Sequence, residues 1–292
     1  MAVRRSALAV PGSSQRMLAK ARELMADEIV IDLEDAVAIA VKAQARDLVG
    51  DVLSGPRAAF GAAVAVRVNS LAGPWGEADV IELAERAGSA IDSMVIPKVE
   101  GAEDVVAVDR LLEAVGESAG AIRLQALVET AQGLLHAGEI AAASPRLDAL
   151  IIGYADLAAS LGRSLGLVPE MWLYAQETVL VAARAAGVQA IDGPYLQIRD
   201  DEGLRRSAEH VRALGFDGKW AVHPGQLAII NATFTPLPEE LARAEVILAA
   251  LADIEGRGAV ELDGEMIDEA SCKLARDIVA RGRAAGLLGG SA

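Results

Sequence analysis

The stretch EIVIDLEDAV, residues 28–37, joins a β-branched apolar run to three carboxylates. Residues 29–31 suit a strand that is buried on both faces of a sheet. Asp32, Glu34 and Asp35 follow at once, although buried carboxylates are costly unless they are paired, hydrogen-bonded or beside a cation. The stretch therefore predicts a strand whose carboxyl end reaches a charged site.

Seven further segments of this kind alternate with Ala-, Leu-, Glu- and Arg-rich helical segments such as 13–26 and 201–215. The eight strand segments are residues 6–12, 28–34, 63–69, 93–99, 122–129, 147–156, 188–195 and 218–224. Alternation of strands and helices indicates an α/β fold with a parallel sheet, and eight units predict closure into a (β/α)₈ TIM barrel. An open doubly wound sheet is the alternative. No glycine-rich nucleotide-binding motif follows any strand, which weighs against a nucleotide-binding version.

The character of the sequence changes after the eighth unit, so residues 1–231 are predicted to form the barrel domain. Residues 232–292 are predicted to form a small C-terminal helical extension or lid. Within it, 234–259 reads as a turn and an amphipathic helix, 260–268 as strand–turn–strand and 269–286 as a last helix. This tail is too small for an independent core, so we expect it to pack on a barrel.

Composition excludes several classes of protein. The 292 residues are 53% hydrophobic and carry a formal net charge of −15, which argues against a nucleic-acid partner. No apolar run approaches the roughly 20 residues that span a bilayer, so no membrane partner is expected. A single cysteine, Cys272, permits no intramolecular disulfide and fits a cytoplasmic location. Its surroundings favour a small buried helix residue over a reactive thiol.

Polar residues at the strand ends are the candidate site residues, because the active site of such a barrel forms at the carboxyl ends of its strands. These ends hold Pro11, Glu34, Asp35, Arg67, Lys98, Glu129, Asp156, Asp192 and His223. Each alone is explained by a solvated strand end. Together they predict a single charged site at the carboxyl end of the barrel, which we call the barrel mouth.

Glu129 and Asp156 form the best metal pair, since both end otherwise apolar strand segments on neighbouring strands. Hard oxygen ligands without a Cys/His cluster favour Mg²⁺. The alternative is that each caps a helix, which suits Asp156 better than Glu129. Glu34 and Asp35 are candidate catalytic carboxylates near the same cation, while Asp32 is expected to pair with an Arg or Lys of the barrel.

Arg67 shares a strand face with Ala65 and Ala63, which leave room for a long side chain inside a barrel. Its guanidinium could hold a substrate carboxylate or carbonyl oxygen. An internal salt bridge to Glu34 or Asp32 is an equally good interpretation.

Three further positions are weaker candidates. Lys98 is expected to be a structural counter-ion, and His223 could contact a ligand. The turn at 13–16 offers backbone N–H groups and the Arg16 cation to a phosphate, although a plain N-cap at Ser13 or Ser14 is more economical.

Several motifs together resemble the citrate lyase β-subunit-like branch of the HpcH/HpaI aldolase superfamily, especially its malyl-CoA and citramalyl-CoA lyases. The motifs are LAVPGSSQRMLAKA (8–21), VIDLEDAV (30–37), VRVNSL (66–71), VIPKVE (95–100), ALVETAQGL (126–134), GYADLAASLG (153–162), GFDGKWAVHPGQ (215–226) and GAVELDGEMID (258–268). One departure is the short segment 162–176, where malyl-CoA lyases usually carry a longer insertion.

The resemblance implies a Mg²⁺-dependent barrel that makes or breaks a carbon–carbon bond in a 3-hydroxyacyl-CoA. It implies that Glu129 and Asp156 bind the metal and that Arg67 binds the substrate. The positions that it places along the substrate and coenzyme A are Gly153, Ala155, Asp156, Pro11, Arg16, Lys20, Val222 and His223.

Asp268 matches the acid/base aspartate that such enzymes present from the tail of a neighbouring subunit. The local sequence alone would predict only an exposed aspartate at a helix entry. The resemblance therefore also implies a homotrimer or hexamer.

The function predicted from these observations is an acyl-CoA lyase that cleaves malyl-CoA or citramalyl-CoA to acetyl-CoA and a 2-oxo acid, glyoxylate or pyruvate. The first alternative is a citryl lyase subunit acting on an acyl-carrier thioester. The second couples condensation to thioester hydrolysis, as in malate synthase chemistry. The third is a non-catalytic metabolite-binding barrel.

Overall fold

The computed structural model describes residues 3–55, 60–164, 169–252 and 259–287. By its internal contacts the chain divides into two compact units, Met1–Asn231 and Ala232–Ala292. Each unit is described by itself.

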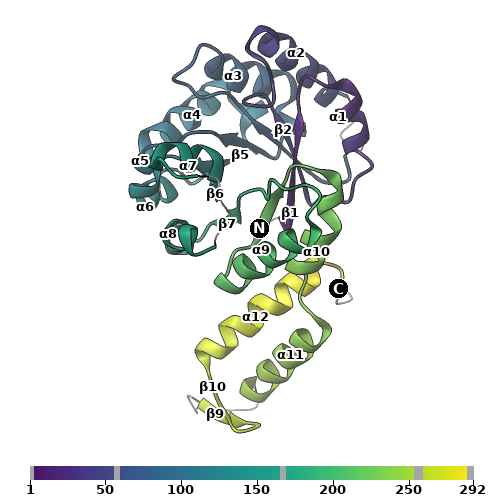
Figure 1. Ribbon diagram of the computed structural model, residues 1–292, viewed down its shortest axis with the longest axis vertical. Coiled ribbons are helices and arrows are strands. Elements are labelled where there is room, and N and C mark those ends of the chain that lie inside the picture. Colours follow the sequence, from purple (N-terminus) through teal and green to yellow (C-terminus); the bar gives the residue numbers. More distant parts are fainter. Residues whose placement is uncertain (1–2, 56–59, 165–168, 253–258, 288–292) are drawn as a thin grey trace. The chain divides into compact units, whose positions relative to one another are not determined.

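The first unit is a closed barrel of eight parallel strands in sequence order, in which β1 pairs with both β2 and β8 (Figure 1). The strands are β1 Ser6–Pro11, β2 Glu28–Asp32, β3 Ala63–Arg67, β4 Ser93–Ile96, β5 Arg123–Val128, β6 Leu147–Ile152, β7 Gln189–Asp192 and β8 Gly218–Ala221. The predicted (β/α)₈ TIM barrel is confirmed, and the open doubly wound sheet is excluded because the sheet closes.

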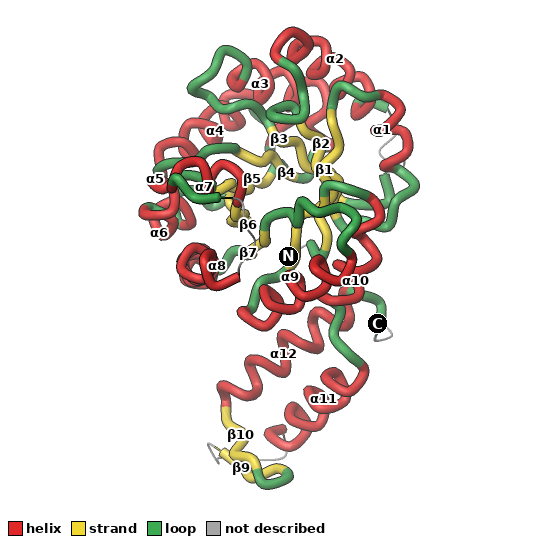
Figure 2. Tube along the Cα trace, viewed as in Figure 1, coloured by secondary structure: helices red, strands yellow, loops and turns green. Residues whose placement is uncertain are grey.

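Helices follow the strands and surround the barrel, as the red segments around the yellow strands show (Figure 2). They are α1 Gln15–Ala21, α2 Lys42–Leu53, α3 Gly76–Ala87, α4 Ala102–Val115, α5 Ala131–Leu135, α6 Ala137–Ala141, α7 Tyr154–Leu161, α8 Pro169–Ala186, α9 Asp201–Leu214 and α10 Leu227–Phe234. None of the helices described is both long enough and apolar enough to cross a membrane.

The barrel interior is filled by alternate residues of the strands, among them Val30, Ala65, Leu127, Ile151 and Trp220. All are at most 4% exposed, and the intervening strand residues are buried under the helices. Because both faces of each strand are covered, the strands read as continuous apolar runs rather than as alternating ones. This packing fixes which side chains point inward at the mouth.

The strands end earlier than the sequence pattern predicted. The second was expected to run to residue 34 but ends at Asp32, whose carboxylate accepts hydrogen bonds from the backbone N–H groups of Glu34 and Ala36. This side-chain-to-backbone pairing replaces the sheet ladder with a turn. The sixth was expected to include Asp156, which instead lies in the first turn of α7.

The second unit contains α11 Pro238–Ala252, the antiparallel hairpin of β9 Ala259–Leu262 and β10 Glu265–Asp268, and α12 Glu269–Ala284. The two helices pack side by side, with Ala244, Ala275 and Val279 buried between them (Figures 1 and 2). Gly282 lies close to α11, because a Cβ there would lie 2.4 Å from Leu241 Cδ2 and would displace that side chain. Cys272 is a buried residue of α12, as expected.

Candidate active site

Asp32 and Arg67 form the centre of the barrel mouth. They end the paired strands β2 and β3 and lie opposite each other in the register. The Asp32 carboxylate accepts two hydrogen bonds from Arg67, from Nε at 2.8 Å and from Nη2 at 2.6 Å. The expected ion pair of Asp32 with a barrel arginine is therefore present. Arg67 Cζ also lies 5.6 Å from the centre of the ring of Trp220, a buried residue of the barrel core.

Glu34 and Asp35 lie beside cations of the protein itself. Arg67 Nη1 is 2.9 Å from Glu34 Oε2 and 3.8 Å from Asp35 Oδ2, and the ammonium of Lys98 donates a hydrogen bond to Glu34. Burial raises the pKa of Glu34, and the charge of Arg67 opposes that rise. The internal salt bridge that was the alternative interpretation of Arg67 is thus formed. It leaves some of the five guanidinium N–H groups for a ligand.

Among the described residues of this cluster, Glu129 is the carboxylate that forms no salt bridge. It follows β5, is 2% exposed and accepts a hydrogen bond of 2.8 Å from the backbone N–H of Lys98. Burial raises the pKa of Glu129 to about 8, and the negative charge of Glu34 adds to the rise. Near neutral pH, the Glu129 carboxyl group is therefore mostly protonated unless a cation lies beside it.

Asp156 lines the same hollow as Glu129 but comes from α7 rather than from a strand end. It is not the N-cap of that helix, because Gly153 takes that position. A Cβ at Gly153 would lie 2.5 Å from Glu129 Oε2, so glycine is needed to admit the Glu129 carboxylate. Both carboxylates of the predicted pair, Glu129 and Asp156, therefore line the same cavity.

This charged hollow has a volume of about 370 Å³ at the carboxyl ends of the strands. Its lining includes Pro11, Asp32, Asp35, Arg67, Leu127, Glu129, Gly153, Tyr154, Ala155, Asp156, Trp220 and Val222. Most of the predicted site residues of the barrel therefore share one cavity.

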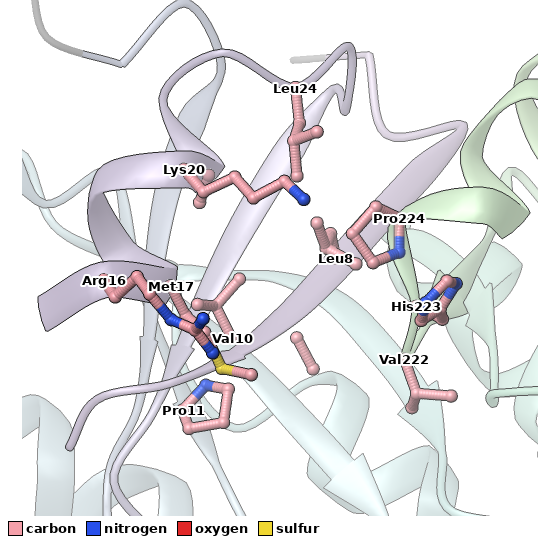
Figure 3. A pocket seen from close by; sticks show the side chains of 12 residues that line it. Leu8, Val10, Pro11, Arg16, Met17, Lys20, Leu24, Val222, His223 and Pro224 are labelled. Atoms are coloured by element: carbon pink, nitrogen blue, oxygen red, sulfur yellow. The ribbon is translucent and has the colours of Figure 1, made fainter. Parts of the chain in front are cut away.

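A second hollow, of about 320 Å³, adjoins the first, since both are lined by Ala9, Val10, Pro11 and Val222. Arg16 and Lys20 of α1 line one side of it and His223 lines another, around an otherwise apolar wall (Figure 3). We call it the α1 hollow. The remaining barrel residues that were predicted to lie along coenzyme A, Arg16, Lys20 and His223, therefore line this one hollow.

Two weaker candidates take up structural roles. Ser14 caps α1 by accepting from the N–H of Met17 at 3.4 Å, which is the economical interpretation of the Ser-Ser turn. His223 accepts a hydrogen bond from the N–H of Gly225 at Nδ1, at 3.1 Å, while lining the α1 hollow.

Asp192, expected at the mouth, does not line the charged hollow described above. It is fully buried and pairs with Lys219, also buried, and it accepts a hydrogen bond from the Tyr154 hydroxyl. Ile191 belongs to the barrel core, so the next residue faces the helix layer. The expectation was wrong because strands buried on both faces give no alternation from which to read the direction of a side chain.

Asp268 lies in the second unit, at the N-cap of α12. Its carboxylate accepts from the N–H of Ser271 at 3.0 Å, and this hydrogen bond holds the pKa of Asp268 below its ordinary value. The local structure is that of a helix-entry aspartate, and its catalytic role stays a prediction.

Lys98 was expected to be only a structural counter-ion, and Tyr154 was not singled out among its neighbours Gly153, Ala155 and Asp156. Lys98 contacts Glu34 and lies 3.6 Å from Asp156, at the heart of the carboxylate cluster. Tyr154 also accepts a hydrogen bond of 2.7 Å from Gln176 and lines the charged hollow. Its position directly before Ala155-Asp156 was the available signal.

The model of the HpcH/HpaI aldolase/citrate lyase family matches residues 5–224. The chain belongs to this family. The predicted resemblance is confirmed, as is the prediction of a lyase.

Curated relatives cover nearly the whole chain. An L-malyl-CoA/beta-methylmalyl-CoA lyase of Cereibacter sphaeroides is 39% identical over 92% of this chain and 91% of its own. A (3S)-malyl-CoA thioesterase of the same species is 42% identical over 96% and 95%. Among solved structures, the protein CitE of Mycobacterium tuberculosis in complex with magnesium, acetoacetate and coenzyme A is 31% identical. It has a TM-score of 0.78 and covers 97% of this chain and 99% of its own.

Proposed function

We propose that this family member is a Mg²⁺-dependent acyl-CoA lyase that cleaves malyl-CoA or citramalyl-CoA to acetyl-CoA and a 2-oxo acid. The observation that carries the proposal is the pair of adjoining hollows with different chemistry. The charged hollow suits a small hydroxy acid, and the α1 hollow, with Arg16 and Lys20, suits a thioester carrier with phosphate groups. The name of the malyl-CoA lyase relative and the ligands of the CitE structure support the same assignment.

Glu129 and Asp156 are the residues that would hold Mg²⁺. In the part of the chain that the structure describes, no group of three His, Cys, Asp or Glu side chains is arranged as a closed metal site. Two carboxylates nevertheless fit Mg²⁺, which is commonly bound by one or two carboxylates together with water and substrate oxygens. The raised pKa of Glu129 supports the fit, since a cation would stabilise its charged form. When bound, Mg²⁺ would act as a Lewis acid on the substrate oxygen that becomes a carbonyl.

Arg67 is proposed to stabilise the negative charge that develops on that oxygen as the carbon–carbon bond breaks. The bidentate pair with Asp32 fixes the guanidinium plane, so its remaining N–H groups are oriented before substrate arrives. A preorganised donor of this kind contributes about 3 kcal/mol to transition-state stabilisation. Asp32 and Glu34 thus orient Arg67.

Asp268 is proposed to protonate the acetyl-CoA enolate on cleavage, and to remove the same proton in the reverse reaction, at the mouth of another copy's barrel. In the reverse reaction its lowered pKa keeps the carboxylate ionised and able to accept that proton, whereas for cleavage it must first take up a proton from solvent. The proposed assembly is a homotrimer or hexamer. Mixing inactive Glu129→Gln and Asp268→Asn proteins and allowing subunits to exchange should restore activity. A mixture that exchanges subunits but stays inactive would show that Asp268 does not act in another copy.

Thioester hydrolysis is a second candidate, because the relative that is 42% identical is named a thioesterase. Turnover of (S)-malyl-CoA, (S)-citramalyl-CoA and citryl-CoA, with 2-oxo acid and free thiol measured together, separates the two. Equal amounts of 2-oxo acid and acetyl-CoA from one substrate would support the lyase and identify its acyl group. Free thiol without 2-oxo acid would support the thioesterase. No turnover of any ester would favour a carrier-bound substrate or a binding barrel.

A further inference from the structure

Lys98 is one residue that contacts both carboxylates of the proposed magnesium site. It lies two residues after β4, and its backbone N–H donates to Glu129 Oε1 at 2.8 Å. Its ammonium Nζ is 3.6 Å from Asp156 Oδ2. The main chain of Lys98 therefore contacts Glu129, and its side chain contacts Asp156.

The backbone of Lys98 has φ of 52°, a left-handed conformation that is unfavourable for a residue with a Cβ. The neighbouring Val99 N–H bonds to the carbonyl of Leu127, two residues before Glu129. The hydrogen bonds from Lys98 N–H to Glu129 and from Val99 N–H to Leu127 hold this strained turn against the end of β5. The orientation of Glu129 therefore depends on the main chain, which survives replacement of the side chain.

The ammonium of Lys98 lies among three carboxylates. It donates a hydrogen bond to Glu34, is 3.7 Å from Asp35 and 3.6 Å from Asp156. Arg67 is the other cation in contact with this cluster, and it is committed to Asp32 and Glu34. The Lys98 side chain is 36% exposed and that of Arg67 is 10% exposed, so Lys98 is the more open of these two cations and the one beside Asp156.

We propose that Lys98 is a positioning residue that competes with Mg²⁺ for Asp156, so that its side chain weakens metal binding to the free enzyme while its main chain orients Glu129. The inference rests on the proposed magnesium-dependent function. Like charges a few ångströms apart repel one another, and this repulsion is lost when the ammonium is removed. A side chain with only a structural role would, when removed, leave metal affinity unchanged or lower it.

Calorimetric titration of Mg²⁺ into the full-length protein, without substrate, tests the proposal directly. Lys98→Met should bind Mg²⁺ more tightly than the wild type, by about threefold to tenfold after solvent screening. Lys98→Arg keeps the charge and should remain closer to the wild type than to Lys98→Met. Lys273→Met, the same change at an exposed residue of α12, should not alter the affinity.

Unchanged or weaker binding in a folded Lys98→Met protein would overturn the proposal, as would Lys98→Arg binding as tightly as Lys98→Met. Folding is checked for each variant by circular dichroism. If the wild type binds no Mg²⁺, the proposed metal-dependent function fails first and the role of Lys98 fails with it. Wild-type binding without the Lys98→Met increase removes the inference about Lys98 alone.

Discussion

The two ends of one barrel both carry buried ion pairs, but the balance of charge differs between them. At the amino end, Arg4 donates to Glu28, to Asp148 and to Gln189 at distances of 2.9, 2.9 and 2.6 Å. Glu28 also accepts a hydrogen bond from Gln125 and is fully buried. None of these side chains is among those that line the two hollows.

At the carboxyl end, five carboxylates lie around Arg67 and Lys98. They are Asp32, Glu34, Asp35, Glu129 and Asp156. Glu129 is served by a backbone N–H instead of a cation, and it lines an open hollow. The amino-end cluster therefore lies apart from the two hollows, whereas the carboxyl end has more carboxylates than cations, as the proposed cation site requires.

Glu129→Gln should have the largest effect on function. Losing one of the two proposed metal carboxylates should lower kcat about a thousandfold, equivalent to about 4 kcal/mol of transition-state stabilisation. Steady-state cleavage at saturating Mg²⁺ measures the loss, with circular dichroism as the control for folding. A kcat within fivefold of the wild type would remove Glu129 from the site.

Arg4→Met should instead break the amino end and affect stability. It leaves Glu28 buried without its cation, which should cost about 3 kcal/mol of unfolding free energy. Urea denaturation measures the loss, with the exposed Arg110→Met as a matched control. Activity of the folded fraction should stay within twofold of the wild type, and a selective loss of activity would contradict the division of roles.

The pH dependence of stability should separate Glu129 from its neighbours. Its pKa is raised from an ordinary 4.5 to about 8, so between these values the folded state holds a proton that the unfolded state has released. Stability contributed by this group is therefore present below pH 4.5 and is lost as pH rises through 8.

Without Mg²⁺, Glu129→Gln should consequently need more urea to unfold than the wild type at pH 8, whereas the two proteins should unfold at similar urea concentrations at pH 4.5. Parallel stability curves for the two proteins across this range would show that Glu129 titrates normally. Added Mg²⁺ should stabilise the wild type more than the variant.

Tyr154→Phe should have the smallest effect. The change removes a hydrogen bond to Asp192 and one from Gln176, but Asp192 keeps its ion pair with Lys219. A loss of about 1 kcal/mol is expected in thermal denaturation, with Gln176→Leu as a comparison. A tenfold fall in kcat would show that Tyr154 also positions the turn that carries Asp156.

Much of the barrel could be predicted from the sequence, because eight apolar runs separated by helical segments admit few other folds. The residues at which the strands end could not be predicted, because they depend on side-chain contacts such as the hydrogen bond from the Glu34 N–H to Asp32. Asp156 was assigned to a strand because Gly153-Tyr154 continues an apolar pattern that in fact opens α7.

The site could be predicted only as a set of strand ends. The strand ends do bring Arg67 and Glu129 together with Asp156, as expected. The same prediction wrongly included Asp192, which pairs with Lys219 instead. The position of Lys98 depends on a left-handed backbone that no local pattern in IPKV indicates. Charge balance among residues from different strands is a property of the closed barrel and cannot be read from any one segment.

Metal dependence of carbon–carbon cleavage by the purified protein tests the proposed lyase activity directly. (S)-Malyl-CoA and (S)-citramalyl-CoA would each be incubated with EDTA and then with excess Mg²⁺, while 2-oxo acid and acetyl-CoA are quantified. We expect no product in EDTA, and equimolar 2-oxo acid and acetyl-CoA from at least one ester once Mg²⁺ is restored. Equal cleavage in EDTA, or free coenzyme A without any 2-oxo acid, would contradict this expectation.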